Sequence, residues 1–312
     1  MTWSSETAFA HLYLPESTGS RKLLSFEYDV DSGEFRCMDG KVLRILPWRE
    51  SVNYLTVQWS TELNEFTYVA GLSIAALKRS ELGKVVISRL HGIARNFQST
   101  HEAFQRLVQL HPEALVYHLH HPRFGEWIGA TPELLFSRDG NTCHTMALAG
   151  TLLAHENADW SQKLLGEHEF VVQDVLAAFR ELQVLNIIRS GPNERIAGAL
   201  KHLETRFTFQ SDATDDMLRK VLHPTSAICG YPRDSALKWI AENEQHERRL
   251  YCGLLSIVDT NSSYVFVNLR CAQIFENQFN LFAGVGLTAQ SDVQEEWKET
   301  ERKLDTIRSQ FL

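Results

Sequence analysis

Near its C-terminus the sequence reads Glu295-Glu296-Trp297-Lys298-Glu299-Thr300, shortly after the glycine pair of Ala283-Gly284-Val285-Gly286-Leu287. Apolar residues recur with a helical period over Val293–Phe311, so we expect a helix there. Glu296 and Glu299 share one face of that helix, where like charges repel by roughly 0.2–0.5 kcal/mol. A bound divalent cation would reverse this repulsion, because magnesium prefers carboxylate oxygens as ligands. Taken alone, the pattern is more typical of a charged helix face in water.

A second carboxylate, Glu167, stands beside His168 in another predicted helix, Gln162–Gln183. By itself this pair is more typical of a helix surface. The sequence contains no Gly-x-Gly-x-x-Gly or Walker-type phosphate loop, and a glycine pair after a strand is only a weak indication of an anion cradle. Neither carboxylate motif therefore predicts a metal site by itself, and only the other motifs of the chain can decide between a site and a helix surface.

Composition narrows the class of protein. Of 312 residues, 44% are hydrophobic and 22% charged, the net charge is −8, and no basic run is present, which argues against a nucleic-acid partner. Five scattered cysteines without a Cys-x-x-Cys pair favour a reducing compartment over a disulfide framework or a zinc site. No basic segment followed by an apolar run begins the chain, and no stretch approaches the roughly 20 apolar residues of a membrane span. We expect a cytoplasmic protein that does not enter a membrane.

The pattern of elements predicts a single α+β domain over residues 1–312. Short apolar runs rich in β-branched and aromatic residues predict strands at Lys22–Tyr28, Lys84–Ser88, Leu115–Leu119, Glu126–Ile128, Glu133–Ser137, Ser263–Leu269 and Gln278–Phe282. Helical periodicity adds Thr100–Leu110 and Asp234–Glu247 to the two helices above. The elements do not alternate as a doubly wound sheet requires, and no linker or repeat divides the chain.

An ordered series of short motifs resembles the chorismate-utilising enzymes, which include isochorismate synthases, salicylate synthases and the large subunits of anthranilate and aminodeoxychorismate synthases. Its C-terminal members are Leu222-His223-Pro224-Thr225 through Tyr231-Pro232, Glu244-x-x-x-Arg248-x-x-Tyr251-Cys252-Gly253, Val267-Asn268-Leu269-Arg270, the glycine pair, and Glu296-Trp297-x-Glu299-Thr300 with Lys303. Upstream members are Lys84 to Arg89, Ile128 to Leu135, Leu148-Ala149-Gly150-Thr151, Glu167-His168 and His202-Leu203. The resemblance implies the fold of anthranilate synthase component I, two packed and largely antiparallel sheets flanked by helices. Residues 81–312 carry the motifs, and residues 1–80 form a divergent N-terminal part.

The resemblance also implies catalytic roles. Isomerisation of chorismate adds water at C2 while the C4 hydroxyl leaves, which requires a base and an acid. Lys84 matches the base, and it can act only if its surroundings lower its pKa towards the working pH. Glu133 matches the general acid, which must be protonated when the substrate arrives. Outside the family, an exposed lysine and a surface carboxylate are the more common interpretations of these residues.

The remaining roles concern binding. Glu167 and Glu299 match Mg²⁺ ligands, with Glu296 as a further or water-mediated ligand, and Mg²⁺ would orient the ring carboxylate of the substrate. The enolpyruvyl carboxylate of the substrate is expected to contact a set of substrate-binding groups: Tyr251, Arg270, Lys303 and the backbone at Gly284 and Gly286. His202 and Thr225 are expected to line the same site.

Position 84 distinguishes members of this family. Relatives that add ammonia typically have glutamine there, whereas Lys84 suits the activation of water. The resemblance therefore predicts an isochorismate synthase that needs no glutaminase subunit. The chain length and the absence of an obvious apolar interface stripe favour a monomer. Salicylate synthase, which goes on to eliminate pyruvate, shares the same residues and stays an alternative. A chorismate-binding pseudoenzyme is a second alternative, and the sequence does not assign the product to menaquinone, siderophore or salicylate synthesis.

Overall fold

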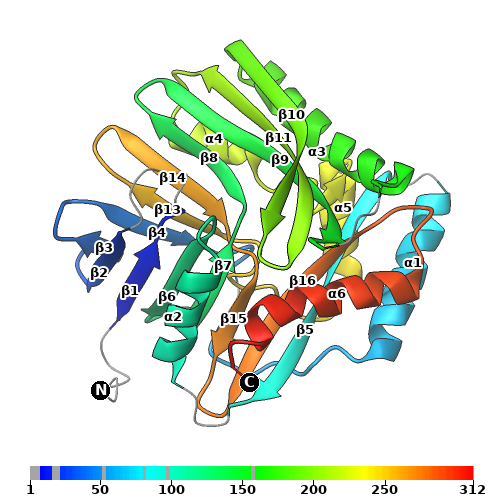
Figure 1. Cartoon of the computed structure of the whole chain (residues 1–312), viewed down its shortest axis with the longest axis horizontal. Helices are drawn as coiled ribbons and strands as arrows, with labels where there is room; N and C mark the ends of the chain where they lie inside the picture. The colour runs from blue at the N-terminus through cyan, green and yellow to red at the C-terminus, as the bar shows by residue number, and fades with distance from the viewer. Residues whose placement is uncertain are drawn as a thin grey trace.

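The computed structural model describes residues 8–15, 22–50, 54–79, 82–95, 99–155 and 159–311, and Figure 1 shows the arrangement. The expectation that no signal peptide begins the chain concerns residues 1–17, of which residues 1–7, 16 and 17 lie outside the described residues. The described helices are α1 (Leu63–Lys78), α2 (Thr100–Leu110), α3 (Gln162–Glu181), α4 (Asp215–Leu222), α5 (Arg233–Asn243) and α6 (Val293–Arg308). None of them is long and apolar enough to cross a membrane.

The strands form one continuous sheet in which every pairing is antiparallel. Its first half contains, in spatial order, β10 (Leu185–Ala197), β11 (Leu200–Gln210), β9 (Thr142–Leu153), β8 (Leu134–Asp139), β14 (Ser262–Val267), β13 (Leu254–Val258), β4 (Val42–Leu46) and β3 (Glu34–Cys37). The second half continues with β2 (Leu23–Asp29), β1 (Phe9–Tyr13), β6 (Leu115–His121), β7 (Gly125–Thr131), β15 (Cys271–Ile274), β16 (Gln278–Leu287), β5 (Lys84–Ala94) and β12 (Gly230–Tyr231).

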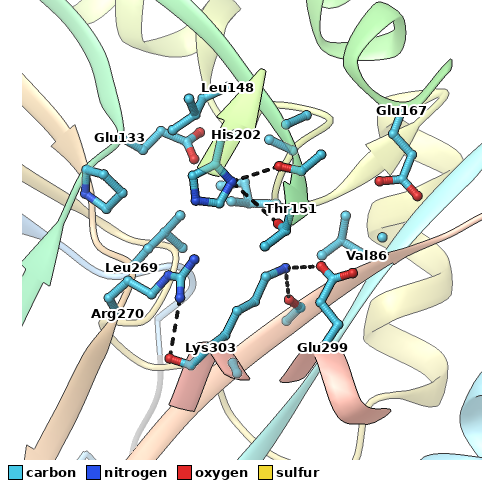
Figure 2. Close-up of a pocket in the computed structure, with 18 of the residues that line it drawn as sticks. Val86, Glu133, Leu148, Thr151, Glu167, His202, Leu269, Arg270, Glu299 and Lys303 are labelled. Atoms are coloured by element: carbon cyan, nitrogen blue, oxygen red, sulfur yellow. Dashed lines mark hydrogen bonds and ion pairs between the residues drawn. The ribbon is translucent and has the colours of Figure 1, made fainter. Parts of the chain in front are cut away.

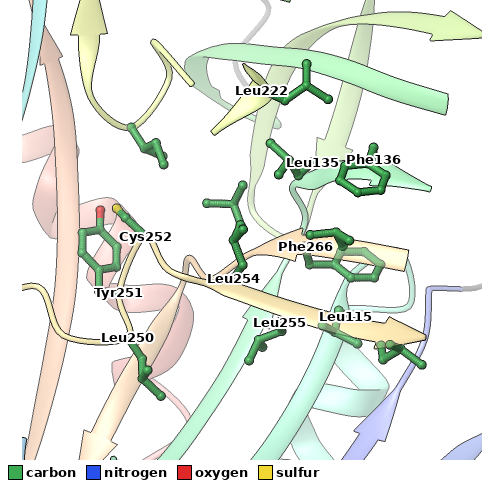
Figure 3. Close-up of a cluster of buried hydrophobic side chains, with 14 of the residues drawn as sticks. Leu115, Leu135, Phe136, Leu222, Leu250, Tyr251, Cys252, Leu254, Leu255 and Phe266 are labelled. Atoms are coloured by element: carbon green, nitrogen blue, oxygen red, sulfur yellow. The ribbon is translucent and has the colours of Figure 1, made fainter. Parts of the chain in front are cut away.

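The two halves of the sheet share one hydrophobic core. A single cluster of buried side chains includes Phe207 of β11 and Phe136 of β8 together with Trp127 of β7 and Phe282 of β16, although these strands lie far apart in the sheet order. Part of this cluster is drawn in Figure 3, where side chains of β8, β13 and β14 lie near the segment that carries Tyr251. The expected pair of packed antiparallel sheets is therefore present as two halves joined by hydrogen bonds.

Helices cover the outer faces of the sheet. Phe104 of α2 and Ile307 of α6 belong to a second apolar cluster with residues of β6, β7, β15 and β16. A third cluster packs α1 and α5 against β5 and β16. Helix α3 contributes Phe179, whose ring contacts Phe207 and Phe209 of β11. In Figure 1, α6 crosses in front of β16 and β5, and α3 lies beside β9 and β11.

Caps determine where the two site-bearing helices begin. The Asp292 carboxylate accepts backbone N–H bonds from Gln294 and Glu295 at the start of α6. At α3, the Ser161 hydroxyl accepts from the N–H of Leu164. Such caps satisfy N–H groups that have no partner within the helix. The caps fix the first residue of each helix, and this determines the side of the helix on which the carboxylates of α3 and α6 lie.

The four helices predicted from periodicity are present, with shorter C-terminal ends for α3, α5 and α6. After Asn243 the chain becomes extended at Glu244, with φ −79° and ψ 125°, so the predicted helix to Glu247 was too long. All seven predicted strands are found, but β1, β3, β4, β9, β10, β11, β12, β13 and β15 were missed, as were α1 and α4. All five cysteines are free thiols.

The shared core gives a stability prediction. Phe136 is 0% exposed within the main cluster, so Phe136→Ala leaves a cavity and should lower the free energy of unfolding by about 3–5 kcal/mol. Trp59, 93% exposed, is the control, and Trp59→Ala should change that free energy by less than about 0.5 kcal/mol. Urea unfolding followed by circular dichroism measures both. Equal effects of the two substitutions would contradict the assignment of the core.

Candidate active site

One cavity gathers ten of the twelve residues that the resemblance assigns to the site. The space inside it, including the part open to solvent, is about 760 Å³, and its lining combines segments from both halves of the sheet with α3 and α6. The predicted residues in the lining are Lys84, Glu133, Glu167, His202, Tyr251, Arg270, Gly284, Gly286, Glu299 and Lys303. In Figure 2, Glu133 and Glu167 lie on opposite sides of the cavity, with Glu299 and Lys303 on α6 below.

Lys84 is the first residue of β5 and is only 2% exposed. Strand alternation points Lys84 and Val86 to the same face, and both line the cavity. Burial lowers the pKa of Lys84, although the nearby carboxylates Glu167 and Glu299 oppose the shift. The amine is therefore easier to deprotonate here than in water, which is the property required of a base.

Glu133 lies in the connection between β7 and β8, across the cavity from α3. Burial raises the pKa of its carboxyl to about 7, and the charge of Lys84 only partly offsets that shift. Thr225 does not line the cavity but lies behind Glu133, with its hydroxyl 3.5 Å from Oε1 of that carboxyl. Thr225 thus contacts the predicted acid, and the structure does not place it where it would touch the cavity contents.

His202 is neutral and presents one free ring nitrogen. Its Nδ1 donates to the carbonyl oxygen of Gly150 at 2.7 Å, and burial together with Arg270 lowers its pKa to about 3. Nε2 then carries the lone pair, and this buried atom has no hydrogen-bond partner among the described residues. His202 can therefore accept a hydrogen bond from a hydroxyl in the cavity.

Cationic groups gather at the α6 side of the cavity. Lys303 donates from Nζ to the carbonyl oxygen of Gly284 at 2.9 Å and forms an ion pair with Glu299 at 2.6 Å. Arg270 donates to the hydroxyl of Thr306 at 3.1 Å, and burial lowers its pKa to about 10, which leaves it protonated at neutral pH. Two cations at one side of the cavity can balance a bound carboxylate.

The glycine pair makes room for two side chains of the site. A Cβ at Gly284 would lie 2.7 Å from the Tyr251 hydroxyl, and one at Gly286 would lie 2.7 Å from Cε of Lys84. The β5–β16 register, which pairs Gly284 with Ser88 and Gly286 with Val86, brings these glycines to the cavity. Glycine is required because any side chain would displace the tyrosine or the lysine.

The three predicted metal ligands are each close to a lysine. Glu299 pairs with Lys303, and that charge holds the pKa of Glu299 below its usual range although burial opposes this. Glu296 is outside the cavity lining and accepts a hydrogen bond from Lys163, which also lies 3.7 Å from Glu167. Burial raises the pKa of Glu167 to about 7. Within the described residues, no three carboxylate, histidine or cysteine side chains already converge as a ligand set.

Even so, the donor set suits a hard cation. Oε1 of Glu167 is buried without a hydrogen-bond partner among the described residues, and carboxylate oxygens are the ligands that Mg²⁺ prefers. Glu295 faces solvent and pairs with Lys298 at 2.8 Å, so it takes no part. Lys163 was not identified as a site residue from the sequence. Its spacing of four residues before Glu167 on a helix is the signal that could have pointed to it.

Comparison with known proteins identifies the family of this chain. Residues 50–312 match the family described as "Chorismate binding enzyme". The isochorismate synthase EntC of Escherichia coli K12 is 31% identical over 277 residues, which are 84% of this chain and 71% of EntC. The chain therefore belongs to the chorismate-binding enzyme family.

Two solved structures share the fold. The menaquinone-specific isochorismate synthase MenF of Escherichia coli superposes with a TM-score of 0.73 at 24% identity, over 82% of this chain and 63% of MenF. Anthranilate synthase component I of Streptococcus pneumoniae superposes with a TM-score of 0.71 at 14% identity, over 98% of this chain and 82% of that chain. The expected anthranilate synthase component I-like fold is thus confirmed.

The raised pKa of Glu133 is measurable without substrate. Carbon-13 NMR of protein labelled at the glutamate carboxyl carbon, in metal-free buffer, should show a resonance that titrates near pH 7 and disappears in Glu133→Gln. The control Glu295→Gln, at an exposed carboxylate, should leave the resonance that titrates near pH 7 in place. A Glu133 resonance that titrates near the ordinary value of 4.5 would contradict the assignment.

Proposed function

We propose that this chain is a Mg²⁺-dependent isochorismate synthase, which converts chorismate to isochorismate. The observation that carries the proposal is the pair formed by Lys84 and Glu133 in one cavity. Burial lowers the pKa of the amine and raises that of the carboxyl to about 7. Compared with the same groups in water, this environment favours the uncharged amine and the protonated carboxyl, the two forms that water addition requires.

Each proton in this reaction has a donor and an acceptor. Lys84 accepts a proton from water as the water oxygen bonds to C2 of the ring. Both ring double bonds shift, from C1–C2 to C1–C6 and from C5–C6 to C4–C5, the C4–oxygen bond breaks, and Glu133 donates its proton to the departing hydroxyl, which leaves as water. One water enters and one leaves, so substrate and product are isomers. Transfer of a proton from Lys84 to Glu133 then restores both groups for the next turnover.

Substrate orientation follows from charge. The two cations Arg270 and Lys303 provide the counter-charge for the enolpyruvyl carboxylate, and Tyr251 can add its hydroxyl. The neutral His202 can accept a hydrogen bond from a ring hydroxyl through its free Nε2. Glu167 and Glu299, with Glu296 nearby, would hold Mg²⁺, which when bound supplies charge neutralisation for the ring carboxylate.

Water is the proposed nucleophile because a lysine occupies position 84. Ammonia is already nucleophilic, whereas water needs a base close to the carbon that it attacks. The proposal therefore includes no ammonia-supplying glutaminase subunit. Similarity to the isochorismate synthase EntC, at 31% identity, supports the same choice.

Product analysis tests the function. Purified protein with chorismate and Mg²⁺, without ammonia or glutamine, should yield isochorismate by liquid chromatography, and isochorismate supplied as the substrate should yield chorismate. Salicylate and pyruvate as the main products would instead make the chain a salicylate synthase. Binding of chorismate without conversion would make it a binding protein. Either result would overturn the proposal.

A single substitution tests the base. Lys84→Gln keeps a polar side chain of similar length but cannot accept the proton, so turnover should fall by about 100-fold or more. Chorismate affinity, measured by calorimetry, should change far less, because the carboxylate-binding cations are intact. The control Lys298→Gln removes an exposed lysine, 60% exposed, and should keep normal turnover. Full activity of Lys84→Gln would show that another group activates the water.

A further inference from the structure

Lys163 connects the two helices that carry the predicted metal ligands. It lies in the first turn of α3, and its ammonium donates a hydrogen bond to Oε1 of Glu296 on α6, 133 positions away in the chain. The same ammonium lies 3.7 Å from Oε1 of Glu167, one turn further along α3. One cation therefore stands between carboxylates of both helices.

Burial makes this arrangement necessary. Glu296 is 1% exposed, and a carboxylate so far from water is costly unless a positive charge compensates it. The neighbouring lysines are engaged elsewhere. Lys303 pairs with Glu299, and Lys298 faces solvent beside Glu295. Lys163 is thus the cation whose hydrogen bond compensates Glu296, to which the Ser291 side chain adds a second hydrogen bond.

Compensation of Glu167 is only partial. Its Oε1 is within 3.7 Å of the Lys163 ammonium, yet it has no hydrogen-bond partner among the described residues. A lysine ammonium is a compact charge on a flexible stem, and here 25% of the side chain is exposed. The ammonium can therefore swing towards solvent without rearrangement of either helix.

We propose that Lys163 is a tethered counter-ion that occupies the carboxylates in the metal-free protein and is displaced when a divalent cation binds. The inference rests on the Mg²⁺ site of the proposed function. Mg²⁺ binds carboxylate oxygens at about 2.0–2.1 Å. An ammonium hydrogen-bonded to Glu296 would then face the metal across a few ångströms, where two positive charges repel.

Two consequences follow from this competition. Lys163 lowers the affinity for Mg²⁺, because part of the binding free energy is used to break its contacts with Glu296 and Glu167. It also stabilises the chain without metal, because the two helices then carry an internal cation between their carboxylates. Lys163 is in this respect a positioning residue, which acts through the ligands and not on the substrate.

Calorimetric titration with Mg²⁺ tests the competition. Lys163→Met keeps the length of the side chain and removes its charge, so the dissociation constant for Mg²⁺ should fall at least about fivefold, at the lower end of typical coupling between sites. Lys298→Met is the matched control, because it removes a solvent-exposed lysine from the metal-bearing helix α6. Its affinity for Mg²⁺ should stay within about twofold of the parent protein, since exposed charges interact weakly.

A second measurement does not depend on binding heat. In EDTA the midpoint of thermal unfolding should be lower for Lys163→Met than for the parent, because Glu296 loses its compensating cation. Saturating Mg²⁺ should then raise the midpoint more in the variant than in the parent. If Lys163→Met does not fold without metal, Lys163→Gln, which keeps a hydrogen-bond donor, replaces it in both experiments.

The outcomes separate two failures. Unchanged or weaker Mg²⁺ binding by the Lys163 variants, with normal binding by the parent, would overturn the competition and leave the metal site standing. Equal tightening in Lys298→Met would assign the effect to net charge and also overturn it. Absence of Mg²⁺ binding in every protein would remove the metal site from the proposed function, and the competition with it.

Discussion

Lys84, Glu133 and Glu167 are almost completely removed from water in a single cavity, where an isolated charge is strongly unfavourable. Each of these groups must then be neutral or lie near an opposite charge. The lowered pKa of Lys84 and the raised pKa values of the two carboxyls, both about 7, are the direct result. Acid–base reactivity near neutral pH thus follows from burial between the two halves of the sheet.

The need to pair a buried charge also explains how α6 is attached to the sheet. Arg89 of β5 is 0% exposed, lies 3.8 Å over the ring of Trp297, and donates from Nε to the Thr300 hydroxyl at 2.6 Å. Its guanidinium also pairs with Glu301. These contacts join α6, which carries Glu299 and Lys303, to the strand that begins at Lys84. The buried arginine therefore links the strand that carries the base to the helix that carries the carboxylates.

The order of short motifs, through its resemblance to the chorismate-utilising enzymes, predicted Lys84 and the glycine pair as site residues. Helical spacing alone placed Glu296 and Glu299 on one face, because a helical period is a local property. The missed strands β9, β10 and β11 show the limit of this approach. Strand β10 is largely exposed, and β9 and β11 alternate between buried and more exposed residues only over residues 142–147 and 205–210, so none of the three alternates along its whole length. Their pairing depends on partners distant in the chain.

The sequence by itself determined the order of the motifs, the helix that bears the carboxylates and the identity of the residue at position 84. Only the tertiary structure decided which of these groups share a cavity and which are charged. It placed Thr225 behind Glu133 and Lys163 against Glu296. The physical reason is that a pKa and an ion pair depend on burial and on neighbours in space, and α3 and α6 meet only after the chain has folded.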